Sequence, residues 1–163
     1  MATIKSSAVL SGNAPDRMNG QVQVAWGHWD FTTDGGGAVD DVIQMVPIPK
    51  GARIIDILVE WPAGFDGSAT FDVGDGGNDD RFMAAISNAT NAGRLSLFGG
   101  FSNAAEIDEA INVSGLGYLY TADDTIDIVT EGGAAAAGDY FDMCVLYTVE
   151  GGFDDDEGDY NGA

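Results

Sequence analysis

The sequence predicts an all-β protein, a single-domain antiparallel β-sandwich, and among sandwiches it favours the jelly roll. Two observations lead to this prediction. The 163 residues include 24 glycines and many Asp and Asn residues, a composition typical of chains with many turns. Short segments with apolar side chains at every second position recur along the chain, as expected for strands with one buried face. A chain of this length buries roughly 70% of its unfolded surface, so one core is enough for stability.

Two consecutive strands, 54–61 and 69–73, are expected with no helix between them, which indicates antiparallel structure. About eight strands of about five residues fit a sandwich of two sheets, a number that favours the jelly roll without excluding other sandwiches. The expected strands are residues 21–31, 42–46, 54–61, 69–73, 82–86 and 94–98, a hairpin of 117–120 with 126–128, and a long last strand, 140–149.

The segment Pro47–Met83 contains the clearest strand pattern. Pro47 and Pro49 cannot donate hydrogen bonds to a sheet, so they are expected at an edge, and Gly51 permits the turn into the next strand. In that strand the odd-numbered positions are all apolar and are expected to face the core. They are Ile55, Ile57, Val59 and Trp61, while Ile54, Asp56, Leu58 and Glu60 are expected on a half-solvated face.

Composition divides the chain into three parts. Residues 1–20 contain few apolar side chains and many turn-forming ones, so they are expected to form an extended N-terminal arm. Residues 21–150 carry the strand pattern and are expected to form the sandwich. Residues 151–163 contain five acidic residues with little to bury, so we expect a flexible acidic tail.

The charge excludes several classes of partner. Lys and Arg total 6 against 27 Asp and Glu, a formal net charge of -21, which would repel the phosphates of a nucleic acid. No apolar run approaches the roughly 18 residues that a membrane span requires. Cys144 is the only cysteine, so no disulfide forms within the chain, and the first residues lack a secretory pattern. We expect a protein made in a cytosol that binds neither nucleic acid nor membrane.

The sequence predicts no enzymatic activity and no cofactor. His28 is the only histidine and lies between two tryptophans in a strand, where a surface or half-buried structural histidine is expected. Cys144 lies in a strand among apolar residues and is expected to be an inert buried thiol. One Cys and one His cannot hold a structural zinc ion, no serine lies in a GxSxG motif, and no carboxylate pair is set in apolar surroundings.

The acidic loop DVGDGGNDDR allows two interpretations. Asp72, Asp75, Asp79 and Asp80 offer oxygen ligands suited to a calcium ion, although their spacing is not that of an EF-hand. The favoured interpretation is structural: Asp75 and Gly76 make the turn, and one aspartate pairs with Arg81.

The three tryptophans also allow two interpretations. Trp26, Trp29 and Trp61 could form a platform on which a sugar stacks, as in carbohydrate-binding modules. Aromatic residues at strand spacing more often belong to a core or a subunit interface, which is the favoured interpretation.

Four blocks of the sequence together resemble a known family. They are IPKGARIIDILVEW, FDVGDGGNDDRFM, GYLYTADDTIDIVTEG and DYFDMCVLYTVEG, in this order and within residues 42–151. They look like small proteins of tailed bacteriophages that resemble capsid cement or decoration proteins. This family has no catalytic motif to transfer, and the GGAAAAG loop and the acidic tail are peculiar to this chain.

The resemblance implies a homotrimeric jelly-roll protein that is made in the host cytoplasm and located in the virion. There it would bind the outer surface of the shell of major capsid proteins and stabilise it, away from the packaged DNA that its charge would oppose. Contacts to the capsid or a neighbouring protomer are then expected from the arm, at Met1, Lys5, Leu10 and Arg17. Candidates for the trimer interface are Ile54, Tyr140 and Leu146. The alternative is a carbohydrate-binding or host-receptor-binding β-sandwich module of a phage fibre.

Overall fold

The computed structural model describes residues 3–5, 21–62, 70–87, 92–98, 112, 115–133 and 138–149. No helix long and apolar enough to cross a membrane lies within these ranges. They contain the strands β1 (Thr3–Lys5), β2 (Val22–Asp30), β3 (Val42–Ile48), β4 (Ala52–Trp61), β5 (Thr70–Asp75), β6 (Asn78–Ser87), β7 (Gly93–Ser96), β8 (Asp124–Glu131) and β9 (Tyr140–Val149).

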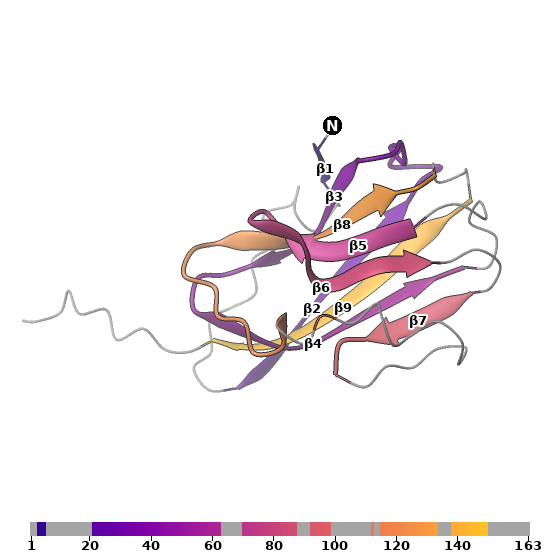
Figure 1. Ribbon diagram of the computed structural model, residues 1–163. Coiled ribbons are helices and arrows are strands. Elements are labelled where there is room, and N and C mark those ends of the chain that lie inside the picture. Colours follow the sequence, from indigo (N-terminus) through magenta and orange to yellow (C-terminus); the bar gives the residue numbers. More distant parts are fainter. Residues whose placement is uncertain are drawn as a thin grey trace, which may run out of the picture.

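The strands form two sheets that pack face to face (Figure 1). One sheet has the order β1-β3-β8-β5-β6 and the other β2-β9-β4-β7. From β2 to β9 each strand lies in the sheet opposite its predecessor, except that β5 and β6 form an antiparallel hairpin. This winding of eight antiparallel strands across two sheets is the jelly roll, so the predicted fold class is confirmed.

The first strand, β1, lies at the edge of the five-stranded sheet and is the one described strand that pairs in parallel. β1 pairs in parallel with β3, with Thr3 opposite Val42 and Lys5 opposite Gln44. Of the expected arm, only these three residues are described. Residues 1–2 and 6–20 and the acidic tail, 151–163, lie outside the described ranges.

Residues 117–120 do not form the expected hairpin with β8. Their partner is the start of β4: the Ile54 N–H donates to the Tyr118 carbonyl at 3.0 Å, and the Tyr120 N–H donates to the Ala52 carbonyl at 2.8 Å. β8 instead lies between β3 and β5 in the other sheet. The hairpin prediction is wrong because a turn sequence shows where the chain bends and not which strand it joins afterwards.

The predicted faces of β4 are correct in its second half and wrong in its first. The pairing of β4 with β9 shifts between Ile54, which faces Tyr147, and Asp56, which faces the next residue, Leu146. The extra residue makes a β-bulge. Even-numbered positions of β4 face the core before the bulge, and odd-numbered positions face it afterwards. Ile54 is therefore buried and Ile55 only partly so, while Ile57 and the later odd positions face the core as predicted.

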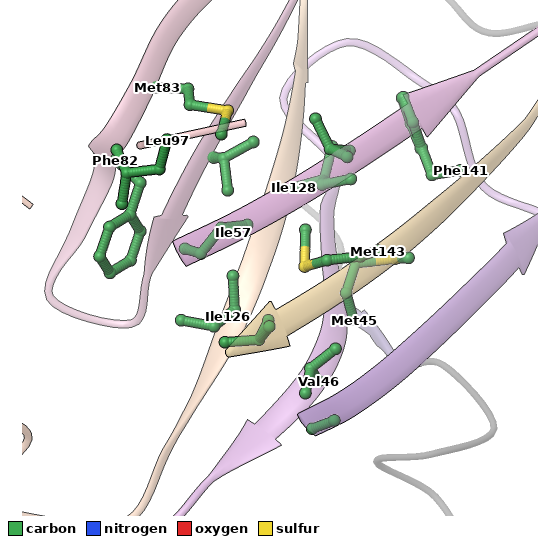
Figure 2. Packing of buried hydrophobic residues seen from close by; sticks show 14 of the residues in the cluster. Met45, Val46, Ile57, Phe82, Met83, Leu97, Ile126, Ile128, Phe141 and Met143 are labelled. Atoms are coloured by element: carbon green, nitrogen blue, oxygen red, sulfur yellow. The ribbon is translucent and has the colours of Figure 1, made fainter. Parts of the chain in front are cut away.

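The core fills the space between the two sheets and draws side chains from every strand from β2 to β9. Figure 2 shows Met45 and Ile128 of the five-stranded sheet with Ile57 and Met143 of the other sheet in this space. All four side chains are fully buried. Because both sheets turn one apolar face inward, their opposite faces remain available for contacts with other molecules.

Aromatic rings close one part of this core. Phe71 packs edge-on against Trp61 and Phe141, with ring centroids 5.2 Å and 4.8 Å apart. Such tilted contacts are a favourable geometry for aromatic pairs. They hold Trp61 inside the sandwich.

Candidate interaction surface

The acidic loop between β5 and β6 is a turn built on Asp75. Its Oδ1 accepts hydrogen bonds from the backbone N–H groups of Gly77 and Asn78, both at 2.9 Å. An aspartate that binds the backbone two and three residues ahead stabilises a tight turn. The structural interpretation of this loop is therefore correct.

Asp75 is also the centre of a buried ion pair. The Arg81 Nε donates to its Oδ2 at 2.5 Å and Nη2 donates to its Oδ1 at 3.2 Å, while the Tyr120 hydroxyl donates to Oδ2 at 3.0 Å. The Arg81 guanidinium carbon lies 4.0 Å from the centroid of the Tyr118 ring. The hydrogen bond to Asp75 raises the pKa of Arg81, and burial, with the Asp75 charge, raises the pKa of Tyr120. Arg81 is thus the local counter-charge of the loop, as predicted.

The four carboxylates considered for calcium do not converge. Asp72 accepts a hydrogen bond from the Ala85 N–H at 2.5 Å across the hairpin, and Asp75 is occupied as described above. Burial raises the pKa of Asp72 to about 6, against the hydrogen bond from Ala85. No group of three His, Cys, Asp or Glu side chains suited to a metal ion occurs among the described residues, which include Asp79 and Asp80.

The three tryptophans do not form a common platform. Trp29 and Trp61 belong to the core, with 1% and 4% of their surface exposed, whereas Trp26 is 65% exposed. A sugar would meet one ring and not three. The sequence alone could not separate these residues, because all three occupy apolar positions of strands.

His28 and Cys144 lie where the sequence predicts. His28 is an exposed residue of β2 whose Nδ1 lies 2.7 Å from Oδ1 of Asp142 on β9. Its ring also lies near Tyr140, with centroids 6.0 Å apart. Cys144 is buried, and burial raises the pKa of its thiol, which keeps it in the less reactive protonated form.

The residues proposed for subunit contacts differ in their availability. Ile54 is buried within the chain by the bulge on β4, so it offers no surface to a partner. Tyr140 and Leu146 are partly exposed on the outward face of β9, and Lys5 is exposed at the end of β1. The remaining arm candidates, Met1, Leu10 and Arg17, lie outside the described ranges.

The outward face of the four-stranded sheet carries an exposed apolar stripe. Val22, Val24 and Trp26 alternate along β2 with 58%, 50% and 65% of their surface exposed. Leu146 of β9 stands directly opposite Val24 and is partly exposed. We call these four residues the β2–β9 stripe. The sequence showed the period of two on β2 but not which side of the strand faces outward.

The opposite face of the sandwich contains a buried carboxyl group. Asp127 of β8 stands opposite Gln44 of β3, and within the described part of the chain Asp127 Oδ1 and Gln44 Oε1 are buried without a hydrogen-bond partner. The amide of Gln44 donates to the Thr125 hydroxyl at 3.0 Å. Burial raises the pKa of Asp127 to about 7, a hydrogen bond from Thr125 opposes this, and the charges of Asp124 and Asp75 add to it.

The sequence has no match among protein-family models or among curated proteins. Solved structures that are similar to it include two chains of phage capsids. A chain in the capsid of Ralstonia phage GP4 aligns with a TM-score of 0.67 and 19% identity, over 91% of this chain and 98% of that chain. A chain of the cyanophage Pam1 capsid asymmetric unit aligns with a TM-score of 0.55 and 21% identity, over 82% and 89% of the two chains.

This protein shares the fold of these phage capsid chains. At such identities the likeness establishes the fold, and for the Ralstonia phage GP4 chain it covers nearly the full length of both molecules. The resemblance seen in the four sequence blocks therefore agrees with the three-dimensional structure.

Replacing Asp75 tests the buried ion pair. Asp75→Asn keeps an oxygen for the turn but removes the charge that pairs with Arg81, and we expect a loss of about 3 kcal/mol in the free energy of unfolding. The matched control is Glu60→Gln, which breaks the exposed pair of Glu60 with Arg94 and should cost less than about 1 kcal/mol. Urea unfolding measures both, and equal losses would contradict a dominant role for the buried pair.

Asp127 should make the protein more stable in acid. Because its pKa is higher in the folded protein than its ordinary value of 3.8, the stability it contributes is present below that value and is lost as the pH rises through about 7. In Asp127→Asn, the decrease in the free energy of unfolding between about pH 5 and about pH 8 should be smaller than in the wild type by roughly 1–3 kcal/mol. The control is Asp79→Asn, which removes the same charge from an exposed position. An unchanged pH profile of unfolding in Asp127→Asn would refute this assignment.

Proposed function

We propose that this protein is a structural component of a bacteriophage virion, a cement or decoration protein. It binds the outer surface of the shell of major capsid proteins and stabilises that shell. The observation that carries the proposal is the jelly roll shared with a chain of the Ralstonia phage GP4 capsid over nearly the whole of both chains. The resemblance of the four sequence blocks to phage decoration proteins supports the same role.

The charge of the chain supports a position on the outside of the shell. A net charge of -21 would oppose packaged DNA if the protein lined the interior, whereas on the outer surface it faces solvent and counter-ions. The likeness to capsid chains also favours a structural role over an enzymatic one.

The proposal includes assembly as a homotrimer. Tyr140 and Leu146 are partly exposed on one face of β9 and are available for a contact between copies. The arm is proposed to reach the shell or a neighbouring protomer, through Lys5 together with Met1, Leu10 and Arg17. Residues 6–20 join β1 to β2, so both of their ends are held at the sandwich, and a chain of about 15 residues tethered in this way can extend up to about 25 Å from it.

Binding to capsids tests the main proposal. Purified protein should sediment with capsids that lack it and raise the temperature at which they melt, while an unrelated protein of similar negative charge should stay in the supernatant. Purified virions should contain hundreds of copies. Failure to sediment, or only a handful of copies per virion, would exclude a role as shell cement and favour a tail or fibre module.

Sedimentation of the free protein tests the trimer. At micromolar concentration the protein should sediment at three times the mass of its 163-residue chain. A monomer under these conditions would contradict a trimer that forms before capsid binding.

A further inference from the structure

The β2–β9 stripe is held on the outside by the geometry of the neighbouring residue in the strand. Gly27 faces inward where β2 crosses β3, and a Cβ atom there would collide with the Met45 carbonyl and approach the Val46 side chain. A shift of β2 by one residue would turn Trp26 to this point, where no side chain fits. Trp26 is therefore exposed because the fold leaves it no inward position.

An exposed apolar stripe on an edge strand is unfavourable for an isolated soluble chain. β2 pairs with β9 on one side, and no described strand pairs with it on the other. Edge strands usually carry charges or prolines that prevent further association, whereas this one presents two valines and a tryptophan on one face. Such a patch marks a surface that another molecule covers.

The charges around the stripe indicate which molecule covers it. The chain carries 27 acidic residues, so most contacts between two copies would bring carboxylates together. The stripe is an exception, because β2 from Val22 to Trp26 has no charged residue. The β9 residues opposite are also uncharged: Thr148 faces Val22, Leu146 faces Val24 and Cys144 faces Trp26.

The carboxylates nearest to the stripe on this face each have a partner in their own chain. Asp142 is hydrogen-bonded to His28, and Glu60 pairs with Arg94. Asp56 accepts hydrogen bonds from the Ser96 hydroxyl at 2.9 Å. Of these three, only Glu60 is paired with a permanent cation, so the face keeps negative charge, but none of that charge lies on the stripe itself. A basic partner would find no carboxylate on the stripe to pair with, whereas a second acidic copy can approach it with less repulsion than elsewhere on the chain.

We infer that the β2–β9 stripe is the surface through which copies of this chain contact one another. A second copy covers Val22, Val24, Trp26 and Leu146, and the acidic remainder of each chain stays in solvent. The inference rests on the homotrimer of the proposed function and assigns a face to it. The contact with the capsid shell then belongs to another part of the molecule.

Substitutions in the stripe test this assignment by sedimentation of the full chain. Val24→Ser and Trp26→Ser should shift the protein from oligomer to monomer, with at least a tenfold weaker association. The matched control is Val39→Ser, because Val39 is 49% exposed against 50% for Val24 and lies outside the stripe. Circular dichroism should show that all three variants keep the β-sheet content of the wild type, since each altered side chain points into solvent.

Tryptophan fluorescence gives an independent readout of the same contact. Trp26 is the exposed one of the three tryptophans, so it dominates quenching by acrylamide in the monomer and should become protected as the wild type associates. In Trp26→Phe, quenching should not depend on protein concentration. A Trp26 that stays quenchable in the oligomer would overturn the inference.

Other results would also overturn the inference, and they separate it from the proposed function. Stripe variants that associate like the wild type, or a wild type that is monomeric at every concentration, would refute the contact between copies. If Val24→Ser abolished sedimentation with capsids but left association intact, the stripe would face the shell. A wild type that associates through the stripe but does not bind capsids would refute only the proposed function.

Discussion

The close crossing of β2 over the backbone of β3 at Gly27 is the constraint on which the two faces of the four-stranded sheet depend. A Cβ atom at position 27 would collide with the Met45 carbonyl, so the position of β2 that faces β3 at this crossing must be a glycine. The period of two along a strand then places Ala25 and Trp29 in the core and Trp26 in solvent. A packing requirement inside the sandwich thus decides which side chains its surface offers to other molecules.

A chain with 6 basic and 27 acidic residues must stabilise most of its carboxylates without ion pairs. Asp72 and Asp75 both accept hydrogen bonds from backbone N–H groups of the β5–β6 hairpin. Arg81 pairs with the deeply buried Asp75, where an unpaired charge would destabilise the folded protein. No cation pairs with Asp127 among the residues that the structure describes, and its burial raises its pKa to about 7.

The distribution of these charges connects the fold with the proposed role. A strongly acidic surface keeps copies of the protein apart except where the surface is apolar and uncharged, so association is directed to one face. The β2–β9 stripe meets this condition because β2 from Val22 to Trp26 and the β9 residues opposite carry no charge. A jelly roll with one such face can form a defined assembly and still present acidic surface to solvent on the outside of a shell.

Local patterns were enough to predict the fold class, most strands and the structural role of Asp75 with Arg81. Alternation of apolar residues indicates a strand with one buried face. Asp75 and Arg81 are six residues apart across a tight turn, so the short chain between them brings the carboxylate and the guanidinium together. These predictions depend on residues that are neighbours along the chain, so they need no knowledge of the folded structure.

Features that depend on contacts between distant segments could not be predicted from local patterns. The bulge that buries Ile54 arises from pairing with β9, and the partner of residues 117–120 is the start of β4 and not the adjacent β8. The burial of Trp29 and Trp61 and the exposure of Trp26 follow from the crossing of two sheets. A period of two shows that a strand has two faces, but the opposing sheet determines which face is inside, because it alone fixes where side chains have room.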